Sequence, residues 1–359
     1  MNDTASPRQL AISSVLMLFS IKLITFPSII FGELKTDALI MFILMLTIDL
    51  GVLFSVLYIK KQFPEMSCFQ ILERFFGRVL TKIITLLLAL FFFGKLLYLV
   101  VEGFSFLRDT LLEEANMILF LFCFIPVINA LAHSNFRAFM RTSEFFFFSI
   151  VGALIICLFL SFVEIDNNML SPLFDVDAGT FFKSLFQKLM WFGDYIYIFV
   201  LIDKIEKNKK NIKKTMLKYN IFAIILLGVF YFAYYRLFQT TSVVHTGAVL
   251  DIVQFSARIG NVGKIDIIPI NVVMFAIFFQ GAIYLLCTKK SLDNLYKKST
   301  INSFIINILL CVLAIGFVTN INICVNIFTN YLSYLALFIA YILPIIVFIL
   351  TLNVKRKKK

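Results

Sequence analysis

Charged residues that interrupt strongly apolar stretches give the clearest chemical signal in this sequence. Lys22, Lys95 and Asp194 lie deepest inside such stretches. An ionised side chain at the centre of a membrane costs about 2.5–3.5 kcal/mol unless it faces a partner or a cavity. These three residues are therefore candidates for buried charges that act in coupling or binding. The alternative is an ion pair that only fixes the packing of helices.

Asp49 and Lys188 also lie inside apolar stretches, and Glu102 lies near the end of one. Lys188 is close enough to the end of its stretch for its ammonium group to reach the membrane surface. Asp49 fits a contact between two helices. We therefore expect these three residues to be less important for function than the three deepest ones.

Two apolar stretches contain residues that interrupt a helix. Residues 19–28 read FSIKLITFPS, and residues 190–195 read MWFGDY. Pro27 has no backbone N–H and disfavours helix at Phe26, and a glycine lies at the centre of the second sequence. Backbone groups freed at such breaks can bind a small polar solute or an ion, although breaks also occur in membrane helices without any site. The residues expected to bind a ligand are Ser20, Thr25, Phe26, Pro27, Ser28, Tyr98, Phe192, Gly193 and Asp194, with Tyr98 expected in the wall of the site.

Catalytic and metal-binding patterns do not stand out. The six cysteines contain no CxxC pair, and His133 and His245 lie in different loops without a cluster of ligands around them. There is no nucleophile–base pair and no glycine-rich phosphate loop. We expect no enzymatic activity, no cofactor and no metal.

The composition indicates a membrane protein that crosses the bilayer several times. Of the 359 residues, 61% are apolar, 15% are charged, and 44 are phenylalanine. The mean hydropathy is +0.95. Soluble domains are roughly half apolar and a quarter charged, so the composition excludes a soluble domain and a disordered chain.

Apolar stretches long enough to cross a bilayer, about 17–25 residues, occur ten times. They cover residues 10–31, 38–58, 83–101, 117–132, 145–163, 185–201, 219–238, 265–287, 301–318 and 331–352. The first is too long for a signal peptide and lacks a cleavage site. We predict one transmembrane domain over 1–359, with a first repeat at about 10–163, a second at about 185–352, and a basic tail at 353–359.

The basic residues orient these spans. With the N-terminus inside, the cytoplasmic segments hold 24 lysines and arginines and the outer segments hold 6. This asymmetry follows the rule that positive charge stays inside, so both termini are predicted to be cytoplasmic. The net charge of +12 has the same explanation, and we expect no binding of nucleic acid.

Two connecting segments have an amphipathic pattern. Residues 62–79 place Phe69, Leu72, Phe76 and Val79 on one helical face, which predicts a helix on the cytoplasmic surface. Residues 245–263 show similar spacing on the outer side. This pattern is consistent with an external lid helix and equally with an interfacial helix that has no gating role.

Ten spans divide into five and five, and an odd number per half gives the halves opposite orientations. In that inverted repeat the first helix of each half is broken near the midplane, which matches the breaks in spans 1 and 6.

Several short motifs resemble the spore germination permease family, the B subunits of GerAB-type nutrient germinant receptors, within the amino acid–polyamine–organocation superfamily. They are SPRQL at 6–10, TFP at 25–27, FGD at 192–194, SARI at 256–259 and GKID at 263–266. The resemblance implies an all-α, LeuT-like fold of ten transmembrane helices with helices 1 and 6 broken. It also implies that Lys22 and Asp194 meet where those helices cross. If these two residues are not coupled, Glu102 is the next candidate partner of Lys22.

One departure concerns Lys22. The superfamily has a glycine-rich break in its first span, where this chain has Ser20-Ile21-Lys22. A lysine there would project into or beside the substrate space, or act as a built-in cation in place of a coupling ion.

The resemblance implies a germinant receptor subunit that binds a small nutrient such as an amino acid. It implies that this subunit acts with an A-type membrane subunit and a C-type lipoprotein in the spore's inner membrane or the cell membrane. The alternative is a proton- or cation-coupled amino acid transporter that works by alternating access. A membrane enzyme or assembly factor is a weaker third hypothesis.

The predicted topology can be tested with single cysteines and a membrane-impermeant thiol reagent. Cysteines in 204–218 are expected to react only from the cytoplasmic side, and those in 163–182 only from outside, because the two segments flank span 6. Labelling of both from one side would contradict the ten-span topology.

Overall fold

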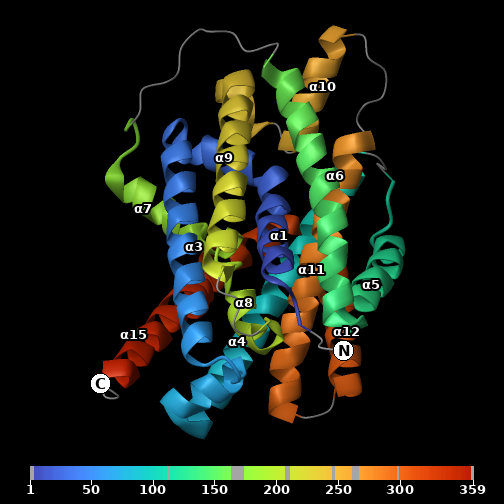
Figure 1. Cartoon of the computed structure of the whole chain (residues 1–359). Helices are drawn as coiled ribbons and strands as arrows, with labels where there is room; N and C mark the ends of the chain where they lie inside the picture. The colour runs from blue at the N-terminus through green and yellow to red at the C-terminus, as the bar shows by residue number, and fades with distance from the viewer. Residues whose placement is uncertain are drawn as a thin grey trace.

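The computed structural model consists of packed helices (Figure 1). It describes residues 4–110, 114–162, 174–206, 211–244, 247–260, 267–296 and 299–356. In these ranges the only bridge between extended residues joins Ala5 and Ile205. The described fold is therefore all-α, as predicted.

Within the described ranges, six helical segments are long and apolar enough to cross a membrane. They are Asp37–Gln62, Cys68–Thr110, Phe136–Phe159, Ile212–Phe238, Val273–Tyr296 and Ile321–Val354. Met117–His133 and Asn302–Val318 are apolar but shorter. Large side chains such as Phe122, Phe159 and Val79 are more than 70% exposed, as expected where a helix faces lipid. The protein is a polytopic membrane protein, and the full count of ten crossings remains a prediction.

The helices have the following bounds: α1 Pro7–Phe19, α2 Phe26–Leu34, α3 Asp37–Gln62, α4 Cys68–Thr110, α5 Met117–His133, α6 Phe136–Phe162, α7 Ala178–Gln187, α8 Ile196–Val200, α9 Ile212–Phe238, α10 Ala248–Gly260, α11 Ile267–Tyr296, α12 Ser299–Val318, α13 Ile321–Asn326, α14 Leu332–Ala336 and α15 Leu343–Arg356. Wider π-helical turns connect α13, α14 and α15.

Helix α1 lies inside the bundle, where α6, α9 and α11 pack around it (Figure 1). Twelve of its thirteen residues are buried. A Ser6–Gln9 capping box and Pro7 in the first turn fix where it begins. Helix α11 packs against α4, α5 and α6, and α15 against α3. The first break therefore lies in the protein interior.

Segments predicted to share a side of the membrane contact one another. Among the predicted cytoplasmic segments, the Lys60 ammonium group donates to the Ile202 carbonyl at 2.7 Å, and Lys290 pairs with Asp203. Among the predicted outer segments, Lys35 pairs with Asp175 at 2.8 Å. These contacts agree with the alternation of the basic residues along the chain.

The structure matches the prediction differently in the two amphipathic segments, 62–79 and 245–263. Helix α4 contains the first of them and bends at Gly77, where φ is 73°. Phe69 and Leu72 are buried but Val79 is 77% exposed, so the predicted apolar face does not continue past the bend. In the second segment α10 packs on α6, α9 and α11 and buries Ile252. The GKID sequence at 263–266 lies outside the described residues.

Candidate functional site

The first break lies between α1 and α2. A short 3₁₀ turn, Ile21–Leu23, separates the two helices, and the backbone of Ser20 and Ile24 is not helical. Pro27 lies in the first turn of α2, a position where its missing N–H costs no hydrogen bond. The break therefore precedes Pro27, and the proline starts the second half of the broken helix.

The second break lies between α7 and α8. A 3₁₀ turn, Leu189–Trp191, follows α7, and Phe192 is extended. Gly193 has φ 72°, a conformation that side chains with a Cβ rarely adopt. A Cβ added to Gly193 would also lie 2.5 Å from the Cβ of Ala340. Backbone conformation and packing both require glycine here.

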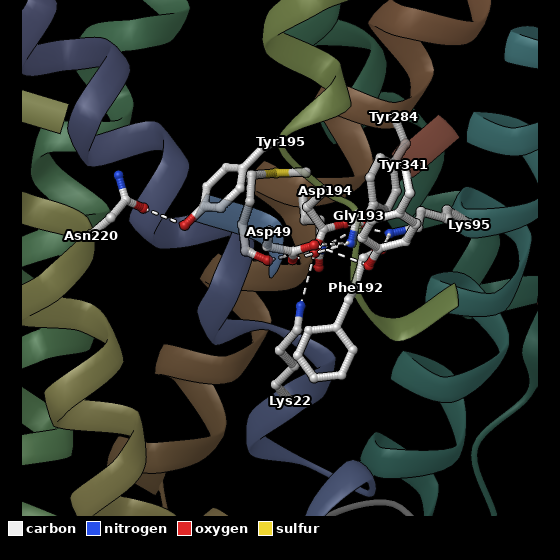
Figure 2. Close-up of polar contacts among 12 residues, drawn as sticks. Lys22, Asp49, Lys95, Phe192, Gly193, Asp194, Tyr195, Asn220, Tyr284 and Tyr341 are labelled. Atoms are coloured by element: carbon white, nitrogen blue, oxygen red, sulfur yellow. Dashed lines mark hydrogen bonds and ion pairs between the residues drawn. The ribbon is translucent and has the colours of Figure 1, made fainter. Parts of the chain in front are cut away.

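Asp194 belongs to the second break and holds two lysines, one of which comes from the first break (Figure 2). Its carboxylate oxygens lie 2.8 Å from the Nζ of Lys22 and 2.6 Å from the Nζ of Lys95. The Tyr284 hydroxyl donates to the same carboxylate at 2.6 Å. The Lys95 ammonium group also donates to the Phe192 carbonyl at 2.6 Å. All three charged groups are at least 97% buried, so they depend on each other for stabilisation.

Asp49 of α3 adds a second carboxylate to this group. It accepts the N–H of Gly193 at 3.1 Å and the Tyr341 hydroxyl at 3.0 Å, and it has no exposed surface. We call Lys22, Asp49, Lys95 and Asp194 the charge cluster. Two lysines face two carboxylates, so the cluster is formally neutral when all four are ionised.

The predicted contact between Lys22 and Asp194 is present, and Lys95 joins it. Asp49 was expected only in a helix–helix contact, and in the structure it also binds the backbone of the second break. The signal that singles out Lys22, a charge within an apolar stretch, applies equally to Asp49. Nothing in the sequence points to Tyr284 or Tyr341 as members of this network.

One expectation needs correction. Lys188 does not extend to the membrane surface: its side chain is 4% exposed and its Nζ lies 2.7 Å from Glu33 of α2. Because Lys22 pairs with Asp194, the alternative pairing with Glu102 does not arise, and the Glu102 carboxylate accepts the Thr25 hydroxyl.

A separate cavity of about 540 Å³ lies between α2, α4 and α13. Its polar lining comes from Thr25, Ser28, Glu33, Tyr98, Glu102 and Ser105. Ile29, Val101, Ile321 and Val325 contribute apolar surface. Small-molecule sites have similar volumes, about 300–1,000 Å³.

The cavity contains only part of the predicted binding set. Thr25, Ser28 and Tyr98 line it. The other six predicted residues are buried outside its lining: Ser20, Phe26, Pro27, Phe192, Gly193 and Asp194. Lys22 is also absent from the cavity lining. Its ammonium group lies against Asp194 instead. The expected single site therefore consists of a cavity and a separate charge cluster.

Aromatic rings connect the two parts. Tyr98 of the cavity contacts Trp191 at 5.5 Å between ring centroids, and Trp191 contacts Phe26 at 5.6 Å. Phe26 contacts Phe192 at 5.4 Å, whose ring centroid lies 5.2 Å from the Nζ of Lys22. A change in the cavity can therefore reach the charge cluster through directly packed side chains.

Helix α10 is joined to the first break through the backbone. The N–H of Ala248, its first residue, donates to the Ile24 carbonyl at 3.0 Å. This bond satisfies a carbonyl group in the non-helical segment. A displacement of α10 would free that carbonyl.

A protein-family model described as spore germination protein matches residues 4–324. The match includes both breaks, the charge cluster and most of the cavity lining. The comparison with curated proteins gives no match.

Charge balance is predicted to determine the stability of the cluster. Asp194→Asn leaves two lysines facing one carboxylate and is expected to cost about 3–5 kcal/mol. The double variant Lys22→Met/Asp194→Asn restores one charge of each sign and should be more stable than Asp194→Asn alone. Thermal unfolding of the purified proteins measures this difference. Lys35→Met, which removes an exposed ion pair, is the control and should cost less than about 1 kcal/mol. Strictly additive effects of the two cluster substitutions would show that they are not coupled.

Gly193→Ala is predicted to destabilise the protein by at least about 2 kcal/mol, because it combines backbone strain with a clash. Adding Ala340→Gly removes the clashing Cβ and should recover part of the loss in thermal unfolding. Gly228→Ala in α9 is the matched control, since an added Cβ there meets no atom within 4 Å. If Gly193→Ala unfolds like wild type, glycine is not required at this break.

Proposed function

Because this chain belongs to the spore germination protein family, we propose that it is the integral membrane subunit of a nutrient germinant receptor. It binds a small nutrient such as an amino acid, and occupancy of the site triggers germination. The cavity supports this proposal, because packed aromatic rings link it to a buried charge cluster at two broken helices. Such an arrangement couples the presence of a ligand to the relative position of helices.

We propose that the fold is a five-plus-five inverted repeat of ten transmembrane helices, LeuT-like, with both termini in the cytoplasm. The breaks between α1 and α2 and between α7 and α8 support it, because they occur in the first helix of each predicted half. Contacts between Ala5 and both Lys204 and Glu206 support it further. They place the start of the chain beside a basic segment of the predicted cytoplasmic side.

Signalling requires two states that the ligand binds with different affinity. Asp194 and Asp49 hold the second break to the first break, α3 and α4 through side chains and the Gly193 N–H. A ligand that moves Tyr98 or Thr25 displaces the rings packed on this break. The partners that receive the change are an A-type membrane subunit and a C-type lipoprotein, in the inner membrane of the spore.

The alternative is a proton- or cation-coupled amino acid transporter with the same fold. The breaks and the cavity favour it as much as they favour a receptor. The position of Lys22 favours the receptor, because a fixed ammonium held by Asp194 already occupies the first break.

The receptor hypothesis predicts that the tagged chain purifies from spore membranes with a larger membrane subunit and a lipoprotein. It also predicts that reconstituted vesicles show no pH-gradient-driven uptake of labelled amino acids above protein-free vesicles. Spores that carry Asp194→Asn should lose their nutrient response, while Lys35→Met spores keep it. Gradient-driven accumulation without associated subunits would favour the transporter.

A further inference from the structure

The cavity contains carboxylates but no basic side chain in its lining. Glu33 and Glu102 both line it. Glu33 already binds Lys188 at 2.7 Å and accepts the Ser184 hydroxyl at 2.6 Å. In the described part of the chain, Glu102 has no lysine, arginine or histidine within ion-pair distance. The cavity therefore holds one carboxylate without a counter-charge.

Glu102 is also incompletely hydrogen-bonded. Glu102 is 6% exposed, and its Oε1 accepts the Thr25 hydroxyl. Its Oε2 is buried and makes no hydrogen bond of acceptable geometry to the described residues, and the Tyr98 side chain lies beside the carboxylate. The Ser105 hydroxyl in the same cavity is likewise buried without a partner. Buried polar atoms are nearly always satisfied in native proteins, so these two are expected to have a partner that comes from outside the chain.

The missing partner has a definite chemistry. An ammonium group supplies both a positive charge and three N–H donors, and it can bind a carboxylate oxygen and a hydroxyl together. A ligand carboxylate would have no cation to bind, because Lys22 and Lys95 are held by Asp194 and Lys188 by Glu33. The apolar lining accommodates an alkyl group.

We propose that this cavity binds a small primary amine, with its ammonium group on Glu102 and its alkyl group against Ile29, Val101, Ile321 and Val325. The ligand makes no ion pair through a carboxylate. The inference rests on the proposed nutrient-binding role and specifies the class of ligand. It places recognition in the cavity beside the breaks and not on the broken backbone itself.

The test uses three probes of equal size and different charge on the purified full-length protein: isobutylamine, isobutyrate and isobutanol. Isobutylamine is expected to raise the unfolding temperature in a saturable way, because a ligand bound only by the folded state stabilises it. Isobutyrate and isobutanol are expected to have no such effect. Equal stabilisation by isobutyrate, or no stabilisation by isobutylamine up to tens of millimolar, would overturn the proposal.

Substitutions of single carboxylates test whether the ammonium group of the ligand binds Glu102. Glu102→Gln should weaken the binding of isobutylamine by about tenfold or more, because it removes a charge-assisted hydrogen bond. Asp175→Asn is the control: it neutralises a carboxylate outside the cavity, in an exposed ion pair with Lys35, and should leave the affinity within about threefold. Unchanged affinity in Glu102→Gln, or an equal loss in both variants, would contradict the assignment. If Glu102→Gln does not fold, the comparison of isobutylamine, isobutyrate and isobutanol on the wild-type protein still tests whether the cavity binds an ammonium group.

Failure of the amine-binding proposal can be distinguished from failure of the receptor hypothesis. Binding of isobutylamine is measured on the isolated protein, and association with receptor subunits is measured in spores. Amine binding without associated subunits would reject the receptor role and keep the site. Associated subunits without amine binding would reject the site alone.

Discussion

The structure depends on one electrostatic constraint: the Asp194 carboxylate, buried where two broken helices meet, must be paired. Asp194 has two ammonium groups and a tyrosine hydroxyl around it, and the three groups come from the first break, α4 and α11. A single side chain therefore joins elements that are far apart in the sequence. Because an unpaired charge at this depth costs several kcal/mol, the positions of these helices are coupled, and both breaks must keep their non-helical shape.

The same constraint explains how the cavity and the cluster divide their roles. Lys22 and Lys95 are fully engaged by Asp194, so neither is free to bind a ligand. Glu102 lies at the cavity instead and lacks a counter-charge. The rings of Trp191, Phe26 and Phe192 separate the two polar regions and contact both. In this account the cavity recognises the ligand and the cluster responds to it.

The sequence predicts the helices and the two breaks because both follow from local chemistry. Apolar runs of sufficient length predict the long helices, and Pro27 and Gly193 indicate the breaks. It also predicts the pairing of Lys22 with Asp194, through the resemblance to a known family. It does not predict the second lysine on Asp194, the partner of Lys188 or the separation of cavity and cluster. These depend on which faces of distant helices meet, and the sequence pattern does not contain that information.

The most direct test of the central claim is a cryo-EM density map of the protein in a lipid nanodisc, with a bound antibody fragment, at a resolution that separates side chains. We expect non-helical backbone at 192–195 and density that joins the Asp194 carboxylate to the ammonium groups of both Lys22 and Lys95. An unbroken helix through 187–200, or an Asp194 side chain that contacts neither lysine, would contradict the central claim.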